Sequence, residues 1–174
     1  NRWSARVSVA RGGRLDAAID RAMEALNTSV DVDSALWRED IAGSVAHARG
    51  LARAGVISAD EAEALVAGLG QVAAEIERGE MVWDRAKEDV HMNIEARLTA
   101  IVGSVGGKLH TARSRNDQIA TDLRLYCRRR AQETLAALDD LGRAVVAQAE
   151  REIDTLMPSY THLQRAQPSR LSHH

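Results

Sequence analysis

The feature that most constrains the fold is one unusually long helical register in the last third of the chain. Apolar residues recur at helical spacing from Asp117 nearly to Leu156. A lone helix of this length would leave its apolar stripe exposed to water. The register therefore predicts a long helix bundle that is shared between subunits. The stripe consists of Ile119, Leu123, Tyr126, Leu135, Leu138, Leu141, Val145 and Ile153.

Shorter amphipathic segments precede this register and predict four further helices. The first runs from Leu15 until Asn27-Thr28-Ser29 breaks the pattern, and the second has Asp33 or Ser34 as its cap and ends at Gly55. The third begins with the capping-box pattern Ser58-x-x-Glu61 and closes at Gly79. The second and third form a predicted helical hairpin. The fourth covers about residues 88–102, with Ile94, Leu98 and Ile101 inward and Gly103 at its end.

Composition agrees with an all-α fold and excludes several classes of protein. Of the 174 residues 45% are hydrophobic but only 3% aromatic, which favours helix-on-helix packing. The net charge of −2 gives no general attraction to nucleic acid or to an anionic membrane. Cys127 is the only cysteine, so no internal disulfide can form, and no apolar run reaches membrane-spanning length. We expect a soluble, cytoplasmic protein that binds neither nucleic acid nor membrane.

The expected organisation is an N-terminal helical domain over residues 1–110 and the beginning of a central helical-bundle domain over 111–174. Residues 1–14 show no clear period and are expected to form an irregular arm. Pro168 occupies a position typical of a first helical turn, with Ser169 to His174 continuing it. Because such a helix would stop within two turns, we expect the domain to continue beyond this sequence.

A polar, glycine-containing stretch, Gly106 to Asp117, separates the fourth helix from the long one. It holds two glycines, three cations, a histidine, hydroxyls and an amide, and is predicted to be a loop. An arginine fork together with free N–H groups near Asn116 or Asp117 suits a carboxylate or a phosphate. The alternative is a solvated surface loop, since the stretch lacks P-loop spacing. The density of donors around Ser114-Arg115-Asn116 favours an anion site.

Two histidines are candidates for chemistry. Thr161-His162 lies in a polar segment between Pro158 and Pro168, predicted to be a second loop, and a loop histidine can move a proton near neutral pH. His91 and Glu95 share a helical face with Asp89 nearby, which raises the alternative of a metal site. We favour a structural pair there and no metal, because neither an HExxH motif nor a Cys/His cluster is present.

Taken together, Gly106 to Gln118 and Tyr160 to Pro168 resemble the argininosuccinate lyase family, which includes the delta-crystallins. Two further stretches carry the resemblance: Glu88 to Glu95, and Asn27-Thr28-Ser29 with Leu36-Trp37 and Asp40 to Ser44. The Arg-Ser-Arg-Asn-Asp run distinguishes this branch from the wider fumarase and aspartase superfamily. The resemblance extends from about Asp16 to the last residue.

The resemblance implies a mainly helical subunit that forms a homotetramer, with active sites shared between subunits. It implies a reversible elimination of argininosuccinate to arginine and fumarate, without a metal or an organic cofactor. By matching positions, His162 would transfer or orient a proton and Ser29 would contact the arginine-side portion. Asp89 and His91 would have a supporting role. The succinyl carboxylates would be held by Ser114, Arg115, Asn116 and Thr161.

Three departures from the family pattern bear on activity. Trp3-Ser4-Ala5-Arg6-Val7 stands where Trp-Gly-Gly-Arg-Phe is usual, and Ser159 replaces a usual glycine. The flexible third signature loop, a source of the catalytic base, would lie beyond His174, so this chain alone would hold an incomplete site. The alternatives to a lyase are a catalytically silent structural relative and a generic helical scaffold or adaptor.

Overall fold

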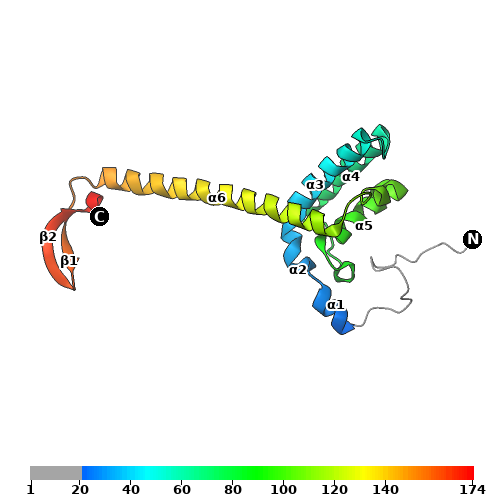
Figure 1. Cartoon of the computed structure of the whole chain (residues 1–174). Coiled ribbons are helices and arrows are strands. Elements are labelled where there is room, and N and C mark those ends of the chain that lie inside the picture. Colours follow the sequence, from blue (N-terminus) through cyan, green and yellow to red (C-terminus); the bar gives the residue numbers. More distant parts are fainter. Residues whose placement is uncertain (1–20) are drawn as a thin grey trace, which may run out of the picture. The chain divides into compact units, whose positions relative to one another are not determined.

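The computed structural model describes residues 21–174, with the side chains of Arg21 and Glu24 outside that description. The predicted arm at residues 1–14, the start of the first helix at Leu15 and the departure at Trp3 to Val7 lie outside the described residues. The helices are α1 (Arg21–Asn27), α2 (Val30–Asp33), α3 (Trp37–Arg53), α4 (Ala59–Glu77), α5 (Val90–Val102) and α6 (Arg115–Arg151) (Figure 1). The strands are β1 (Leu156–Thr161) and β2 (Gln164–Arg170), and short 3-10 helices are η1 (Ser34–Leu36), η2 (Arg85–Lys87), η3 (Gly103–Lys108) and η4 (Leu171–His173).

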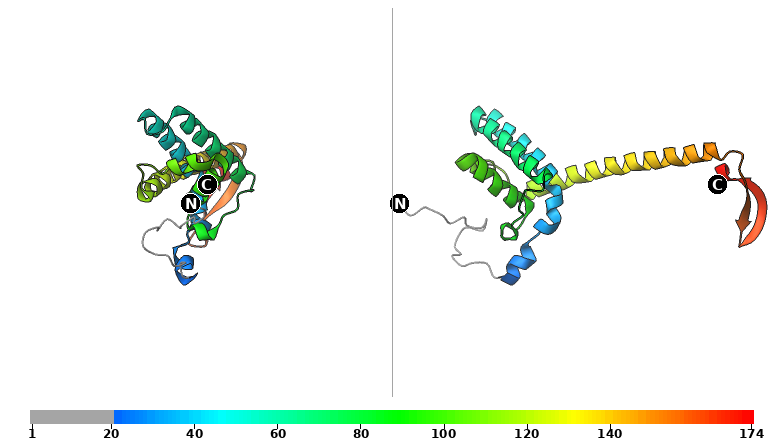
Figure 2. Two further views of the ribbon diagram at one scale, coloured as in Figure 1. Left: turned by 90° about the vertical axis from the view of Figure 1, so that its right-hand side faces the viewer. Right: turned by 180° about the vertical axis from the view of Figure 1, so that it is seen from behind.

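The described chain divides into two compact units, residues 21–126 and residues 127–174. In the first unit α3 and α4 form the predicted hairpin and lie side by side in both views of Figure 2, and α5 packs against α4. The capping box of Ser58 and Glu61 is present at the start of α4. Gly55, Gly79 and Gly103 follow their helices with positive φ, as expected for residues that end a helix.

The core of the first unit comes from the apolar stripes of α3, α4 and α5. Ile94 and Leu98, predicted to point inward, are fully enclosed, while Ile101 is half-buried at the edge of the core. The burial of these aliphatic side chains is the main stabilising term for the unit. The enclosed core residues of these helices include Ala48, Leu65, Leu69, Val72 and Val90.

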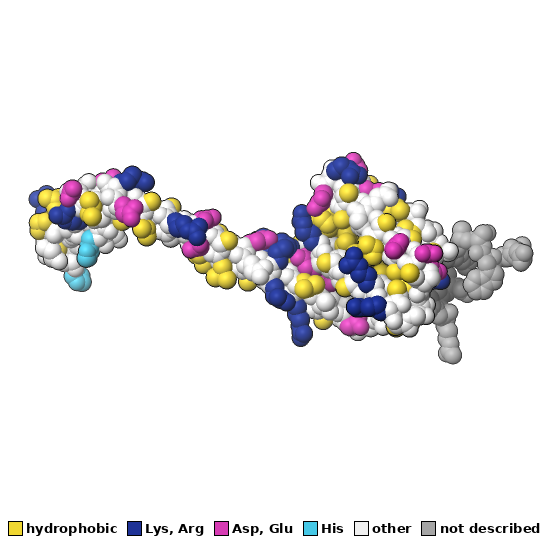
Figure 3. Space-filling model, turned by 90° about the horizontal axis from the view of Figure 1, so that it is seen from above, with side chains coloured by type: hydrophobic (Ala, Val, Ile, Leu, Met, Phe, Trp, Pro, Cys, Tyr) yellow, Lys and Arg dark blue, Asp and Glu magenta, His cyan; other side chains and the backbone are white. Residues whose placement is uncertain are grey.

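The second unit contains most of the long helix and a β-hairpin. Most of the predicted stripe lies on α6 and is exposed within the described chain, as Leu135, Leu138, Leu141 and Val145 show. The helix ends at Arg151, earlier than predicted, so Ile153 falls outside it. Apolar side chains are visible along this helix in Figure 3. None of the helices in the described chain combines the length and the apolar character that crossing a bilayer requires.

The segment between the two prolines is a strand pair, so the prediction of a loop there is wrong. Pro158 lies opposite Pro168 in the antiparallel register, and both strands of this two-stranded sheet are edge strands, where a proline is tolerated. The predicted helix start at Pro168 is also wrong, because β2 continues to Arg170 before η4 begins. A proline that suits a first helical turn suits this strand position equally well, and the pairing decided between them.

The domain boundary expected near residue 110 stays a prediction. The mainly helical architecture is confirmed, with the hairpin as its exception.

Candidate functional site

The stretch predicted to bind an anion is more ordered than a plain loop. It begins in η3, and Gly106 packs so closely on α5 that an added Cβ would lie 2.7 Å from the Thr99 Cα. His47 of α3 contacts the Thr111 carbonyl through Nε2 at 3.0 Å. The long helix begins at Arg115, so Arg115, Asn116 and Asp117 lie in its first turn and not in a loop.

This first turn presents polar groups at a helix N-terminus. Ser114 precedes the helix and its Oγ accepts from the Asn116 N–H at 3.3 Å. Ser114 and Asn116 are exposed, whereas Arg115 is half-buried. Free N–H groups of a first turn and the positive end of the helix dipole favour a bound carboxylate here.

The guanidinium of Arg115 is held by three side chains from two helices. It donates to Gln118 Oε1 at 2.6 Å and to Glu95 Oε2 at 3.4 Å, and its Nε lies 3.6 Å from Asp89 Oδ2. Asp89 is also the N-cap of α5, where it accepts from the Met92 N–H at 2.7 Å. Arg115 is therefore oriented within its own chain before any ligand binds.

Ser29 joins the same neighbourhood through the chain before α5. Its N–H donates to the Glu88 carbonyl at 2.8 Å, and its Oγ donates to Asp33 Oδ2 at 2.6 Å. Asp33 Oδ1 in turn accepts from the Val90 N–H at 3.1 Å. Burial raises the pKa of Asp33, and the hydrogen bonds from Ser29 and Val90 oppose that rise. The structure thus links Ser29 to the turn that carries Asp89.

His91 has a different environment from the one expected from its pairing with Glu95. It is 2% exposed, and its Nδ1 lies 2.9 Å from Asp40 Oδ1 and 3.6 Å from Asp122 Oδ2. The Gln118 amide donates to the same Asp40 oxygen, and Arg113 Nη2 lies 4.0 Å from it. We call Asp40, His91 and Asp122 the buried cluster.

The surroundings shift the pKa values of the two carboxyl groups of the buried cluster in opposite directions. Burial alone would raise the pKa of Asp40, but the hydrogen bond and charge of His91 outweigh it and lower that pKa. Burial raises the pKa of Asp122 to about 7, and the neighbouring charge of Asp40 adds to the rise. Each residue offers one ligand atom, all within 4.8 Å of one another. Because the Arg113 guanidinium lies beside Asp40 and the neutral Gln118 amide already donates to it, the arrangement suits a proton better than a metal ion.

Sequence reasoning assigned no role to Asp40, Arg113, Gln118 or Asp122. One signal was available on α3, where Asp40 and Ser44 continue the buried stripe of Ala48 and Leu51 at helical spacing. On α6 the buried pair is Gln118 and Asp122, one turn apart, whereas Ile119 and Leu123 are exposed. The apolar register therefore does not mark the face that packs in the first unit.

Thr161 and His162 belong to the second unit and are described by themselves. Thr161 pairs with Gln164 across the hairpin, and His162 and Leu163 form the two-residue turn between them. Both turn residues have positive φ, 49° for His162 and 61° for Leu163, positions that ordinarily favour Asn and Gly. The Ser159 replacement lies beside the register irregularity without a positive φ, so its backbone is not strained.

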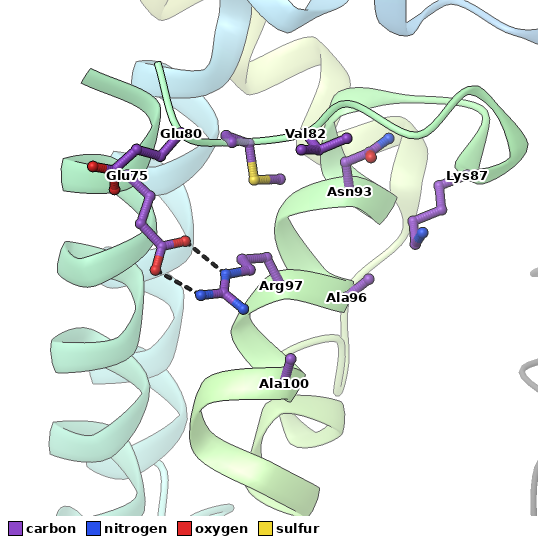
Figure 4. Close-up of a pocket in the computed structure, with 9 residues that line it drawn as sticks. Glu75, Glu80, Val82, Lys87, Asn93, Ala96, Arg97 and Ala100 are labelled. Atoms are coloured by element: carbon purple, nitrogen blue, oxygen red, sulfur yellow. Dashed lines mark hydrogen bonds and ion pairs between the residues drawn. The ribbon is translucent and has the colours of Figure 1, made fainter. Parts of the chain in front are cut away.

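A separate depression of about 430 Å³ lies beside α4 and α5. Figure 4 shows its most prominent contact, where Arg97 donates to both Glu75 carboxylate oxygens at 2.6 and 2.7 Å. Its other charged lining groups are also paired, Lys87 with Asp84 and Glu80 with Arg78. The cations of this depression are therefore each paired with a carboxylate.

Solved structures similar to this chain are themselves lyases. "EDDS lyase variant D290M/Y320M with bound fumarate" has 32% sequence identity and a TM-score of 0.64, and the match covers 82% of this chain and 27% of that one. "Crystal structure of fumarate lyase from Mesorhizobium sp. BNC1" has 25% identity and a TM-score of 0.60, covering 87% and 35%. The matched architecture agrees with the expected fumarase and aspartase type of fold.

Argininosuccinate lyases are among the sequence relatives of this chain. The argininosuccinate lyase of Thermus thermophilus is 53% identical over 164 residues, which are 93% of this chain and 36% of the relative. That of Syntrophotalea carbinolica is 51% identical over 162 residues, 93% of this chain and 35% of the relative. The chain thus spans about a third of the length of these curated relatives. The family model described as "Lyase" matches residues 13–174, and the chain belongs to this lyase family.

Proposed function

We propose that the polypeptide catalyses the reversible elimination of argininosuccinate to arginine and fumarate, in arginine biosynthesis. The observation that carries the proposal is the 50–53% identity with argininosuccinate lyases over nearly the whole chain. The link of Ser29 to the Glu88-Asp89 turn and the contact of Asp89 with Arg115 at the start of α6 support it.

The chemistry needs three kinds of group. A base removes a weakly acidic proton beside a carboxylate, donors stabilise the aci-carboxylate that forms, and an acid protonates the departing guanidinium nitrogen. Arg115 and the N–H groups of the first turn of α6 suit the second task, because they are charged or dipolar donors held before the reaction begins. The proposed carboxylate ligands are Ser114, Arg115, Asn116 and Thr161.

His162 is proposed to transfer or orient the proton, and Ser29 to contact the arginine-side portion. Asp89 and His91 are proposed to have a supporting role, since His91 is enclosed and Asp89 caps α5 while facing Arg115. The reaction is proposed to need neither metal nor organic cofactor.

The active assembly is proposed to be a cytoplasmic homotetramer with shared sites. The exposed stripe of α6, with Leu135, Leu138, Leu141 and Val145, supports it because water contact with such a stripe is unfavourable. Light scattering on a purified sample tests the assembly. A monomer at micromolar concentration would contradict it.

The activity is tested with a chimera in which residues 13–174 replace the matching part of the Thermus thermophilus enzyme. Fumarate formation from argininosuccinate, followed by absorbance, is expected at a rate close to that of the parent enzyme. A folded, assembled chimera without turnover would favour the silent, crystallin-like relative instead. Loss of fumarate binding as well would favour the scaffold alternative.

A further inference from the structure

The buried cluster contains one side chain whose oxygens form no hydrogen bond with the described residues. Asp122 is 0% exposed, and neither of its carboxylate oxygens has a hydrogen-bond partner among the described residues. An ionised carboxylate in such a position loses its hydration without compensation, which is strongly unfavourable. Some other arrangement of protons must satisfy it.

The nearby donors are already directed elsewhere. His91 Nδ1 is 2.9 Å from Asp40 Oδ1 but 3.6 Å from Asp122 Oδ2, and the Gln118 amide donates to Asp40. Arg113 donates to Ser44 Oγ at 3.1 Å through Nη1. Asp40 therefore receives the donors, and Asp122 is left facing an ionised neighbour.

The backbone of α3 approaches the Asp122 side chain closely. A Cβ added to Gly43 would lie 3.3 Å from Asp122 Oδ1, so α3 approaches this side chain closely at a residue without one. The titratable or charged groups that face Asp122 are Asp40 and His47 from α3, His91 from α5, Arg113 before α6 and Asp117 from the first turn of α6.

We propose that Asp122 is a positioning residue that holds a proton and donates it in a hydrogen bond to Asp40, fastening the first two turns of α6 to α3 and α5. The neutral carboxyl supplies the donor that its surroundings lack and removes the repulsion between two carboxylates. Gln118, one turn earlier on α6, donates to Asp40 Oδ1. Gln118 and Asp122 together thereby fix the helix that begins with Arg115 and Asn116.

Stability against pH tests the proton. Asp122 has a folded pKa of about 7 against an ordinary value of 3.8, so its stabilising contribution is complete below the ordinary value and is lost as pH rises to about 7. Asp122→Asn keeps the shape and a donor but cannot ionise. We expect the variant to melt close to wild type at pH 5 and about 5–10 °C above it at pH 8.

The melting measurement uses this chain and the chimera, with Asp60→Asn as the matched exposed control, expected to follow wild type at both pH values. The proposal would be overturned if Asp122→Asn melts below wild type at pH 8 by a margin equal to or larger than its margin at pH 5. If the variant does not fold, infrared spectra of the wild type decide. A protonated carboxyl band present at pH 6 and absent at pH 9 supports the proposal, and its absence at both overturns it.

The positioning role rests on the proposed function and is tested in the chimera by kinetics. Asp122→Ala is expected to raise the KM for argininosuccinate about tenfold by loosening the first turns of α6, and Asp122→Asn to restore it to within about threefold. Equal KM values for the two variants would remove the positioning role. The melting comparison needs no turnover, so its outcome is independent of whether the polypeptide is a lyase.

Discussion

In the first unit the side chain of His91 is enclosed by two carboxyl groups, whereas in the second unit that of His162 is exposed at the tip of a hairpin. The first histidine is fixed by packing among α3, α5 and α6, and the second by local backbone geometry alone. Hydrogen bonds are stronger in a buried site than in water, and packing fixes the geometry of the groups that form them. An exposed side chain has neither advantage until other atoms cover it. The comparison indicates that tertiary packing holds the polar groups of the first unit in place, whereas within the described chain only the hairpin turn positions His162.

The largest expected effect concerns the exposed histidine. His162→Asn in the chimera is expected to lower kcat/KM by about 10²–10⁴-fold, the usual contribution of a positioned acid or base. The measurement is steady-state fumarate formation. His173→Asn, an exposed histidine of the same unit, serves as the control and is expected to change little. Unchanged turnover in His162→Asn would show that this exposed histidine takes no part in the reaction.

Truncating a core side chain of the first unit is expected to lower stability more than truncating an exposed side chain of the second unit. Leu65→Ala is expected to lower the free energy of unfolding of the first unit by about 2–5 kcal/mol, because Leu65 is completely enclosed. Leu163→Ala, which removes atoms from a 100% exposed side chain, is expected to stay within about 0.5 kcal/mol. Urea denaturation measures both. Similar losses for the two variants would contradict the contrast in packing.

Arg115 tests whether the prepared site binds an anion. Arg115→Ala is expected to weaken fumarate binding by about 10–100-fold, since a charge-assisted hydrogen bond is worth about 1.5–3 kcal/mol. Calorimetric titration of the chimera with fumarate measures this loss. Arg53→Ala, an exposed arginine in the last turn of α3, is the matched control. Intact binding in Arg115→Ala would leave the three contacts of that guanidinium as purely structural.

The smallest effect concerns the hairpin turn. Leu163→Gly is expected to stabilise the second unit by about 1 kcal/mol, because Leu163 has a φ of 61° that glycine adopts without a Cβ penalty. Thermal melting with Leu171→Gly as the control, outside the turn, measures it. A destabilised Leu163→Gly variant would indicate that the leucine side chain is packed in the assembled protein.

The sequence by itself determined most of the helices and several of their ends. Apolar periodicity located α3, α4, α5 and α6, and the Ser58 capping box located the start of α4, because both depend on neighbours within a few residues. The motif around Arg115 identified the candidate anion site for the same local reason. The cap predicted at Asp33 or Ser34 is wrong, since α2 and η1 occupy those positions and α3 begins at Trp37 without a side-chain cap. The roles expected for Ser29, Thr161 and His162 remain predictions.

Only the tertiary structure decided which polar residues meet. Asp40, His91 and Asp122 are far apart in the chain and converge through the packing of three helices, which no local pattern encodes. The hairpin likewise depended on pairing Pro158 with Pro168, against a local pattern typical of a loop and a helix start. Local chemistry specifies elements, whereas the burial of a charge and the pairing of strands depend on distant residues, and these determine where protons and hydrogen bonds are held.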